Sequence, residues 1–175
     1  MDGIVIVNTG DGKGKTTSAL GIILRSMGYS KKICIISFLK SPEYKTGEEL
    51  FFKANNIEYY CTGIGFTWEK TPEEHRKALK NAVDITKQKL KEDYDLLVLD
   101  ELNYVFSVKE FKTDDIFNVD EIINMLMNRN KKMNVVITGR NAPQKLIDFA
   151  DTVTEMKMVK HCFNNGKDAA EGIDF

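Results

Sequence analysis

The chain has 175 residues, a length that suits one domain with a substantial core, so we expect residues 1–175 to form a single domain. Hydrophobic residues make up 42% and charged residues 29%, which excludes a disordered chain, and the longest apolar runs are too short for a membrane span. The net charge of −1 disfavours nucleic acid as a partner. No basic segment precedes the first apolar run, so we expect no secretory signal and a cytoplasmic location.

Five short apolar runs predict β-strands, at residues 4–7, 33–38, 57–60, 96–99 and 135–138. Each run is nearly continuous and rich in β-branched residues or leucine, which is typical of strands that are buried on both faces of a sheet. A sixth segment, residues 154–158, alternates apolar and charged residues and predicts a half-exposed edge strand.

Helix-period stripes of apolar residues separate these runs. They predict helices over residues 19–27, 79–90 and 119–126, and Pro143 suits the first turn of a short fourth helix. Alternating strands and helices give an α/β fold. We therefore expect a P-loop NTPase-like architecture, an open, mostly parallel β-sheet flanked by helices on both faces, with ligands beyond the carboxyl ends of the strands.

A glycine-rich loop connects the first predicted strand to the first predicted helix. In this context backbone N–H groups surround phosphate oxygens and the helix dipole favours the anion. Lys15 supplies a positive charge and Thr16 is placed to bind Mg²⁺, whereas Lys13 is either a solvated loop residue or a second cation for the phosphates. The strict phosphate-loop pattern has glycine where this chain has Thr9. The residues expected to hold a nucleotide are Gly10, Asp11, Gly12, Lys13, Gly14, Lys15, Thr16 and Thr17.

Two carboxylates, Asp100 and Glu101, follow the apolar run at 96–99. In phosphate-loop proteins this position holds Mg²⁺ or its water ligands. Adjacent side chains on an extended segment point to opposite sides, so one acid is expected to bind the metal while the other orients or packs elsewhere. The pattern indicates a Mg·ATP-binding α/β protein and leaves the reaction open.

Five blocks in chain order resemble the ATP:corrinoid adenosyltransferases of the CobA, CobO and BtuR type. The first is the loop, which matches their TG[ND]GKGKTT motif, and that family also lacks the glycine that Thr9 replaces. The other blocks lie at residues 63–69, 99–104, 137–140 and 150–175. The resemblance implies a cytoplasmic homodimer that transfers the 5′-deoxyadenosyl group of ATP to the cobalt of a reduced corrinoid, either cob(I)alamin or cob(I)yrinic acid a,c-diamide, and releases triphosphate. It also implies Mg²⁺, a cobalamin or cobinamide-type corrinoid and an electron donor such as a reduced flavoprotein.

Carried over residue by residue, the resemblance implies roles at the nucleotide. Thr16 and Glu101 would bind Mg²⁺, with Asp100 as the other candidate. Lys13, Lys15 and Glu101 would take part in catalysis, the two lysines by stabilising the charge that grows on the triphosphate.

Four further residues are candidates for contacts with the substrates. Phe66 and Trp68 would form an apolar wall that displaces the lower axial ligand of cobalt and eases its reduction; the alternative is two core aromatics under a loop. Arg25 and Arg140 are candidates for ATP contact, or else form surface salt bridges.

Two other functions remain open at this point. A phosphate-loop ATPase or kinase would form ADP, whereas the transferase forms triphosphate. A nucleotide-gated corrinoid-binding protein would deliver the corrinoid without turnover.

Overall fold

The computed structural model describes residues 2–41, 43, 45–65 and 70–174. Six strands form one sheet in the order β3-β2-β4-β5-β1-β6, and every neighbouring pair is parallel. The strands are β1 (Val5–Thr9), β2 (Ile33–Ser37), β3 (Glu58–Cys61), β4 (Leu96–Asp100), β5 (Asn134–Thr138) and β6 (Thr152–Glu155). The predicted open parallel sheet is therefore confirmed.

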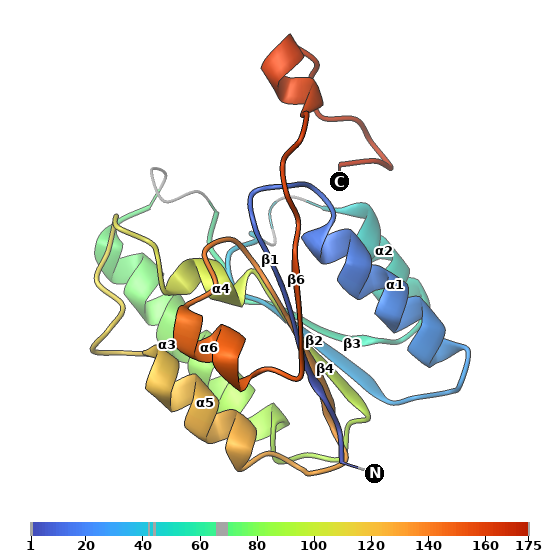
Figure 1. Ribbon diagram of the computed structural model, residues 1–175, viewed down its shortest axis with the longest axis vertical. Helices are drawn as coiled ribbons and strands as arrows, with labels where there is room; N and C mark the ends of the chain where they lie inside the picture. The colour runs from blue at the N-terminus through green and yellow to red at the C-terminus, as the bar shows by residue number, and fades with distance from the viewer. Residues whose placement is uncertain (1, 42, 44, 66–69, 175) are drawn as a thin grey trace.

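Helices cover both faces of this sheet, as predicted (Figure 1). On one face lie α1 (Lys15–Met27) and α2 (Gly47–Ala54). On the other face lie α3 (Pro72–Lys89), α4 (Leu102–Val105), α5 (Val119–Met127) and α6 (Gln144–Phe149). No helix in the described part of the chain has the length and apolar content that crossing a membrane would require.

The central strand β4 shows why the apolar runs are continuous. Leu97 and Leu99 pack in the core beneath α3, α4, α5 and α6, whereas Leu96 and Val98 pack in the core beneath α1 and α2. All four side chains are buried. Because both faces are covered, successive residues all enter a core, and the strand needs no polar alternation.

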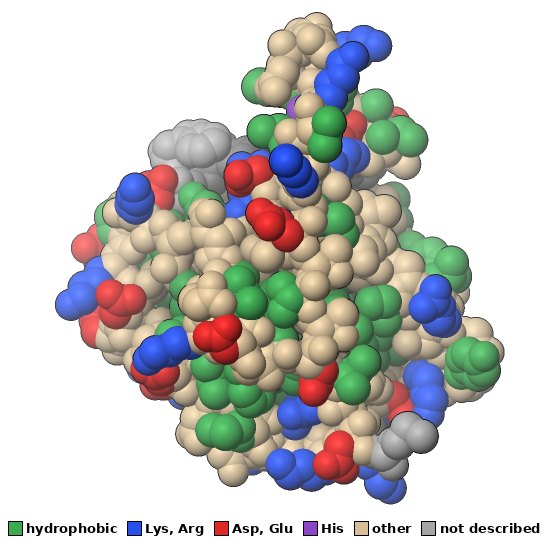
Figure 2. Space-filling model, in the orientation of Figure 1, with side chains coloured by type: hydrophobic (Ala, Val, Ile, Leu, Met, Phe, Trp, Pro, Cys, Tyr) green, Lys and Arg blue, Asp and Glu red, His purple; other side chains and the backbone are tan. Residues whose placement is uncertain are grey.

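The structure differs from the sequence prediction at the edge strand and at two helices. Strand β6 ends at Glu155 and all four of its residues are exposed, so the expected alternation of buried and exposed side chains is absent from it. The chain after β6 projects from the body as a separate arm that contains a short 3₁₀ helix (Cys162–Asn165) and then turns back (Figures 1 and 2). Helix α2 was not predicted, and Pro143 caps α6 rather than lying in its first turn.

The parallel sheet collects the ends of its strands along one edge. The glycine-rich loop follows β1, Lys40 lies shortly after β2, Glu101 follows β4, and Thr138 ends β5. Strand β5 lies between the strand that carries the loop and the strand that carries the acids. Residues far apart in the sequence therefore meet at this edge.

Candidate active site

The loop after β1 ends where α1 begins. Gly10 and Gly14 have φ values of 94° and 118°, a backbone region that favours glycine. Gly14 is the N-cap of α1 and makes no side-chain capping bond, and the first turn of α1 contains no acidic residue. The N–H groups of that turn are left to meet an anion, as in phosphate-binding loops.

Two of the loop glycines are also required by close packing. The Gly12 N–H donates to the Met156 carbonyl at 2.6 Å, and a Cβ on Gly12 would come within 2.6 Å of the same oxygen. A Cβ on Gly10 would meet that oxygen at the same distance. The segment after β6 therefore supports the loop from behind.

A side-chain contact accounts for Thr9 at the position where the strict loop pattern has glycine. Its hydroxyl accepts a hydrogen bond from the Ala142 N–H at 3.0 Å, which ties the end of β1 to the turn before α6. Glycine has no side chain to make this contact.

Lys15 lies across the loop. Its side chain is buried, and its ammonium donates to the carbonyls of Gly10 at 2.8 Å and Gly12 at 2.9 Å. Burial lowers the pKa of Lys15, while the nearby Glu101 opposes this effect. The charge is thus held in a fixed position at the loop, as electrostatic catalysis requires.

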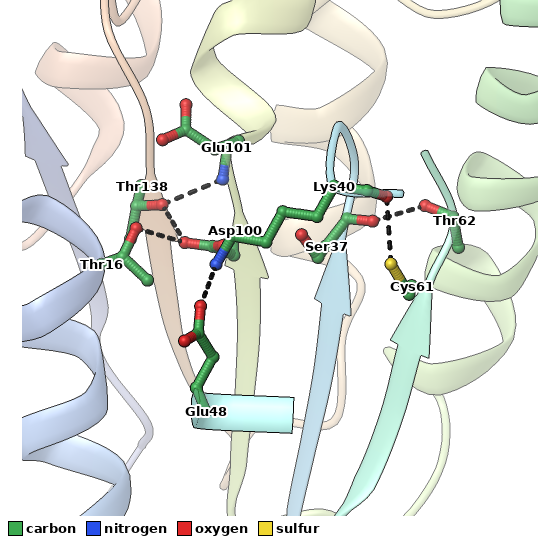
Figure 3. Close-up of polar contacts among 9 residues, drawn as sticks. All are labelled: Thr16, Ser37, Lys40, Glu48, Cys61, Thr62, Asp100, Glu101 and Thr138. Atoms are coloured by element: carbon green, nitrogen blue, oxygen red, sulfur yellow. Dashed lines mark hydrogen bonds and ion pairs between the residues drawn. The ribbon is translucent and has the colours of Figure 1, made fainter. Parts of the chain in front are cut away.

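Both carboxylate oxygens of Asp100 contact neighbouring side chains of the protein (Figure 3). One carboxylate oxygen, Oδ1, accepts from the hydroxyl of Thr16 at 2.9 Å and from that of Thr138 at 2.8 Å. The other, Oδ2, lies 3.1 Å from the ammonium of Lys40. Asp100 is 3% exposed, so these partners replace water.

Glu101 has a different environment from its neighbour. Its backbone is left-handed, with φ 60° and ψ 20°, and its N–H donates to the Thr138 hydroxyl at 2.9 Å. Its carboxylate turns away from the Asp100 cluster (Figure 3). Among the described residues, the recorded hydrogen bond of Glu101 outside its helix is the one from its N–H, and its carboxylate accepts none. Burial raises the pKa of Glu101, and the adjacent Asp100 raises it further.

Lys40 and Glu48 belong to this site although the sequence interpretation missed both. The Lys40 ammonium lies 2.5 Å from a carboxylate oxygen of Glu48, in the first turn of α2, as well as near Asp100. Burial would lower the pKa of Lys40, but Asp100 and Glu48 outweigh this and raise it. The sequence contained a signal for Lys40, because this residue lies shortly after a buried strand, and the loop and the acids also lie at strand ends.

A pocket of about 620 Å³ opens over these groups, within the usual range for small-molecule sites. One end carries the loop, Lys40, Glu48 and Glu101, and the other is an apolar groove between α1 and α2 that includes Leu20, Leu24 and Phe51. The pocket thus combines a charged end for phosphates with an apolar groove.

Of the other residues expected to contact the nucleotide, some line the pocket and others do not. Thr17 lines the pocket, and Asp11 is exposed on the loop. Lys13 also lines it and forms an ion pair with Asp174, where the C-terminal segment returns to the loop. Arg140 is exposed after β5, close enough to lower the pKa of Lys15 and of Glu101. Arg25 lies in the last turn of α1, roughly 15 Å along the helix axis from Lys15, and is not among the residues that line the pocket.

A second pocket of about 550 Å³ lies beyond the ends of β2 and β3, against the start of α3. Ile64 and Lys70 line it, on either side of residues 66–69 in the sequence. The predicted corrinoid residues Phe66 and Trp68 lie outside the described residues.

The donor set at the first pocket fits a magnesium ion. Thr16 and Glu101 line this pocket and offer a hydroxyl and a carboxylate, the oxygen ligands that Mg²⁺ prefers, and Asp100, which does not line the pocket, is hydrogen-bonded to Thr16. No group of three or more His, Cys, Asp or Glu side chains suited to a metal occurs in the described ranges. A Mg²⁺ site with one or two protein ligands is completed by substrate phosphates and water.

Fold and site together define a P-loop nucleotide-binding α/β protein. A KaiC-like protein, PH0186 from Pyrococcus horikoshii OT3, has a similar fold, with a TM-score of 0.53 at 16% identity over 91% of this chain and 75% of that one.

The chain belongs to the ATP:corrinoid adenosyltransferase BtuR/CobO/CobP family, which matches residues 1–175. It is 37% identical to the corrinoid adenosyltransferase CobA of Salmonella typhimurium, over 99% of this chain and 86% of that protein. It is 36% identical to a corrinoid adenosyltransferase of Pseudomonas aeruginosa, over 99% of this chain and 84% of that protein.

Proposed function

We propose that this chain transfers the 5′-deoxyadenosyl group of ATP to the cobalt of a reduced corrinoid and releases triphosphate. The observation that carries the proposal is the charged nucleotide pocket at the loop after β1, in a chain that matches the corrinoid adenosyltransferase family from its first residue to its last. The cobalt(I) electron pair forms a bond to C5′ of ATP, and the bond between C5′ and the triphosphate oxygen breaks with its electrons going to triphosphate.

The protein contributes to this reaction by binding the phosphates, aligning the reacting atoms and neutralising the charge of the leaving triphosphate. Lys15 and the N–H groups at the start of α1 hold the phosphates and stabilise the negative charge that grows on the leaving group. Lys13 takes part after exchanging Asp174 for phosphate. Thr16 and Glu101 would hold Mg²⁺, which supplies further neutralisation of that charge. Holding cobalt, carbon and oxygen in line lowers the entropic part of the barrier.

The corrinoid half of the site rests on the family resemblance. Phe66 and Trp68 would form the apolar wall against the corrin. The second pocket, which is lined by Ile64 before them and Lys70 after them in the sequence, would receive part of the same substrate. Trp68→Ala should chiefly slow the reaction that starts from cob(II)alamin and a weak reductant. The proposal includes a cytoplasmic homodimer that receives its electron from a donor such as a reduced flavoprotein.

One experiment separates this function from the alternatives. The protein is mixed with ATP, Mg²⁺ and chemically reduced cobalamin, the visible spectrum is followed for adenosylcobalamin, and the products are examined by phosphorus NMR. Adenosylcobalamin and triphosphate in equal amounts are expected. ADP with orthophosphate, and no cobalt–carbon bond, would identify an ATPase, and binding without turnover would identify a delivery protein. Lys31→Met, at the opposite end of the sheet, is the active control.

A further inference from the structure

Lys40 is held in the site by three contacts. Its ammonium lies between Asp100 and Glu48, at 3.1 and 2.5 Å (Figure 3). Its backbone carbonyl accepts a hydrogen bond from the Cys61 thiol at 3.0 Å, which ties the turn after β2 to the end of β3. The side chain is 26% exposed and faces the nucleotide pocket.

The contacts of the two neighbouring acids are unequal. Asp100 accepts two hydroxyl hydrogen bonds on Oδ1 and faces the ammonium with Oδ2, and it does not line the large pocket. Glu101 lines that pocket and accepts no hydrogen bond from the described residues. A carboxylate already paired with a cation and two hydroxyls loses those partners if it turns toward a metal, whereas Glu101 loses none.

We propose that Lys40 is a positioning residue that keeps Asp100 as the hydrogen-bond acceptor of Thr16 and so reserves direct contact with the divalent cation for Glu101. This inference rests on the proposed Mg·ATP site. Glu48 supports this role of Lys40, because it holds the ammonium from the α2 side and balances its charge. The adjacent acids thus have separate tasks, which the sequence left open.

Removing the charge of Lys40 tests this role. In Lys40→Met the Oδ2 of Asp100 loses its cation, and the buried carboxylate of Asp100 and the half-buried carboxylate of Glu48 lose their shared positive charge. Free carboxylates attract a divalent cation, so the variant should bind one more tightly in the absence of nucleotide. If the ion pair only holds α2 against the sheet and lies too far from the cation site to affect it, the affinity would instead stay unchanged.

The measurement is Mn²⁺ binding to the nucleotide-free protein, read from the loss of the free Mn²⁺ signal in electron paramagnetic resonance. Lys40→Met should bind Mn²⁺ about tenfold or more tightly than wild type, because a cation next to the site has been removed. Lys40→Arg, which keeps the charge, and Lys31→Met, an exposed ion-pair lysine at the other end of the sheet, should remain within about twofold. Thermal melts check that each variant folds, and Lys40→Gln, a second neutral variant, should show the same gain because it also lacks the charge.

A second substitution assigns the gained affinity to Asp100. Adding Asp100→Asn to Lys40→Met should remove the gain, whereas Glu101→Gln in the wild-type background should weaken Mn²⁺ binding in the presence of ATP. The inference is overturned if folded Lys40→Met and Lys40→Gln bind Mn²⁺ no more tightly than wild type, or if the gain survives Asp100→Asn. No corrinoid enters this assay, so a chain that binds Mn²⁺ as expected but makes no adenosylcobalamin would refute only the proposed function.

Discussion

Glu101 is the position where function and stability are expected to oppose each other. Its backbone has φ 60° and ψ 20°, in the left-handed region, and its N–H is fixed by the Thr138 hydroxyl. A residue with a Cβ costs about 1–2 kcal/mol in this region, and glycine does not. Glycine also gains more freedom in the unfolded chain, which offsets about 0.5–1 kcal/mol of that benefit.

Comparing Glu101→Gly with Glu101→Ala isolates this backbone effect. Both variants lose the carboxylate, so its desolvation and its interactions cancel in the comparison. We expect Glu101→Gly to be more stable than Glu101→Ala by about 0.5–1 kcal/mol, which corresponds to roughly 1–4 °C in melting temperature for a domain of this size. Both should lose about 100-fold or more in kcat/KM, because a metal ligand contributes several kcal/mol to stabilising the charge of the transition state.

The assays are urea and thermal unfolding by circular dichroism, and adenosylcobalamin formation with Mg·ATP. Glu101→Asn is the intermediate case, since asparagine tolerates the left-handed region better than other side chains. An alanine variant as stable as the glycine variant would refute the backbone reasoning. Activity within tenfold of wild type in either variant would refute the assignment of Glu101 to the metal.

Three further predictions concern the same edge of the sheet. Burial raises the folded-state pKa of Glu101 above its unfolded value of about 4.3. As pH rises above 4 the unfolded chain therefore ionises first, and wild type should lose stability relative to Glu101→Gln. A stability difference between the two that stays constant in urea titrations from pH 4 to 7 contradicts this. Lys15→Met should lose about 10²–10³ in kcat, and retention of a tenth of the activity would show that its charge is not needed. Gly12→Ala should lower stability by about 1–3 kcal/mol, because its Cβ meets the Met156 carbonyl at 2.6 Å, whereas Gly21→Ala, with open space around its Cβ, should be neutral or stabilising in thermal melts.

The fold was predictable because its signals are local. The runs around β2, β4 and β5 are apolar without alternation, and this pattern is typical of strands covered on both faces. The glycine-rich loop is equally local, since a strand, a flexible turn and a helix N-terminus are consecutive in the chain. Helix α2 was missed because its apolar segment is short, and Phe52 is the one residue of the helix that is buried.

The candidate site was predicted in part. The loop, Asp100 and Glu101 were found because each lies at or directly after the carboxyl end of a strand. Thr138 was missed, since its role as a bridge between the two acids depends on β5 lying beside β4. Arg25, a candidate for ATP contact, lies in the last turn of α1, and its contact with the nucleotide stays a prediction. Phe66 and Trp68 stay predictions.

The sequence alone determined the class of fold, the family and the phosphate loop, because periodicity and motif spacing are properties of consecutive residues. Only the tertiary structure decided the different environments of Asp100 and Glu101 and brought in Lys40 and Glu48. The physical reason is that a carboxylate's role depends on which groups surround it. Those groups come from the turn after β2, from α2, from β5 and from the start of α1. The order of strands in the sheet, which no local pattern contains, brings them to one place.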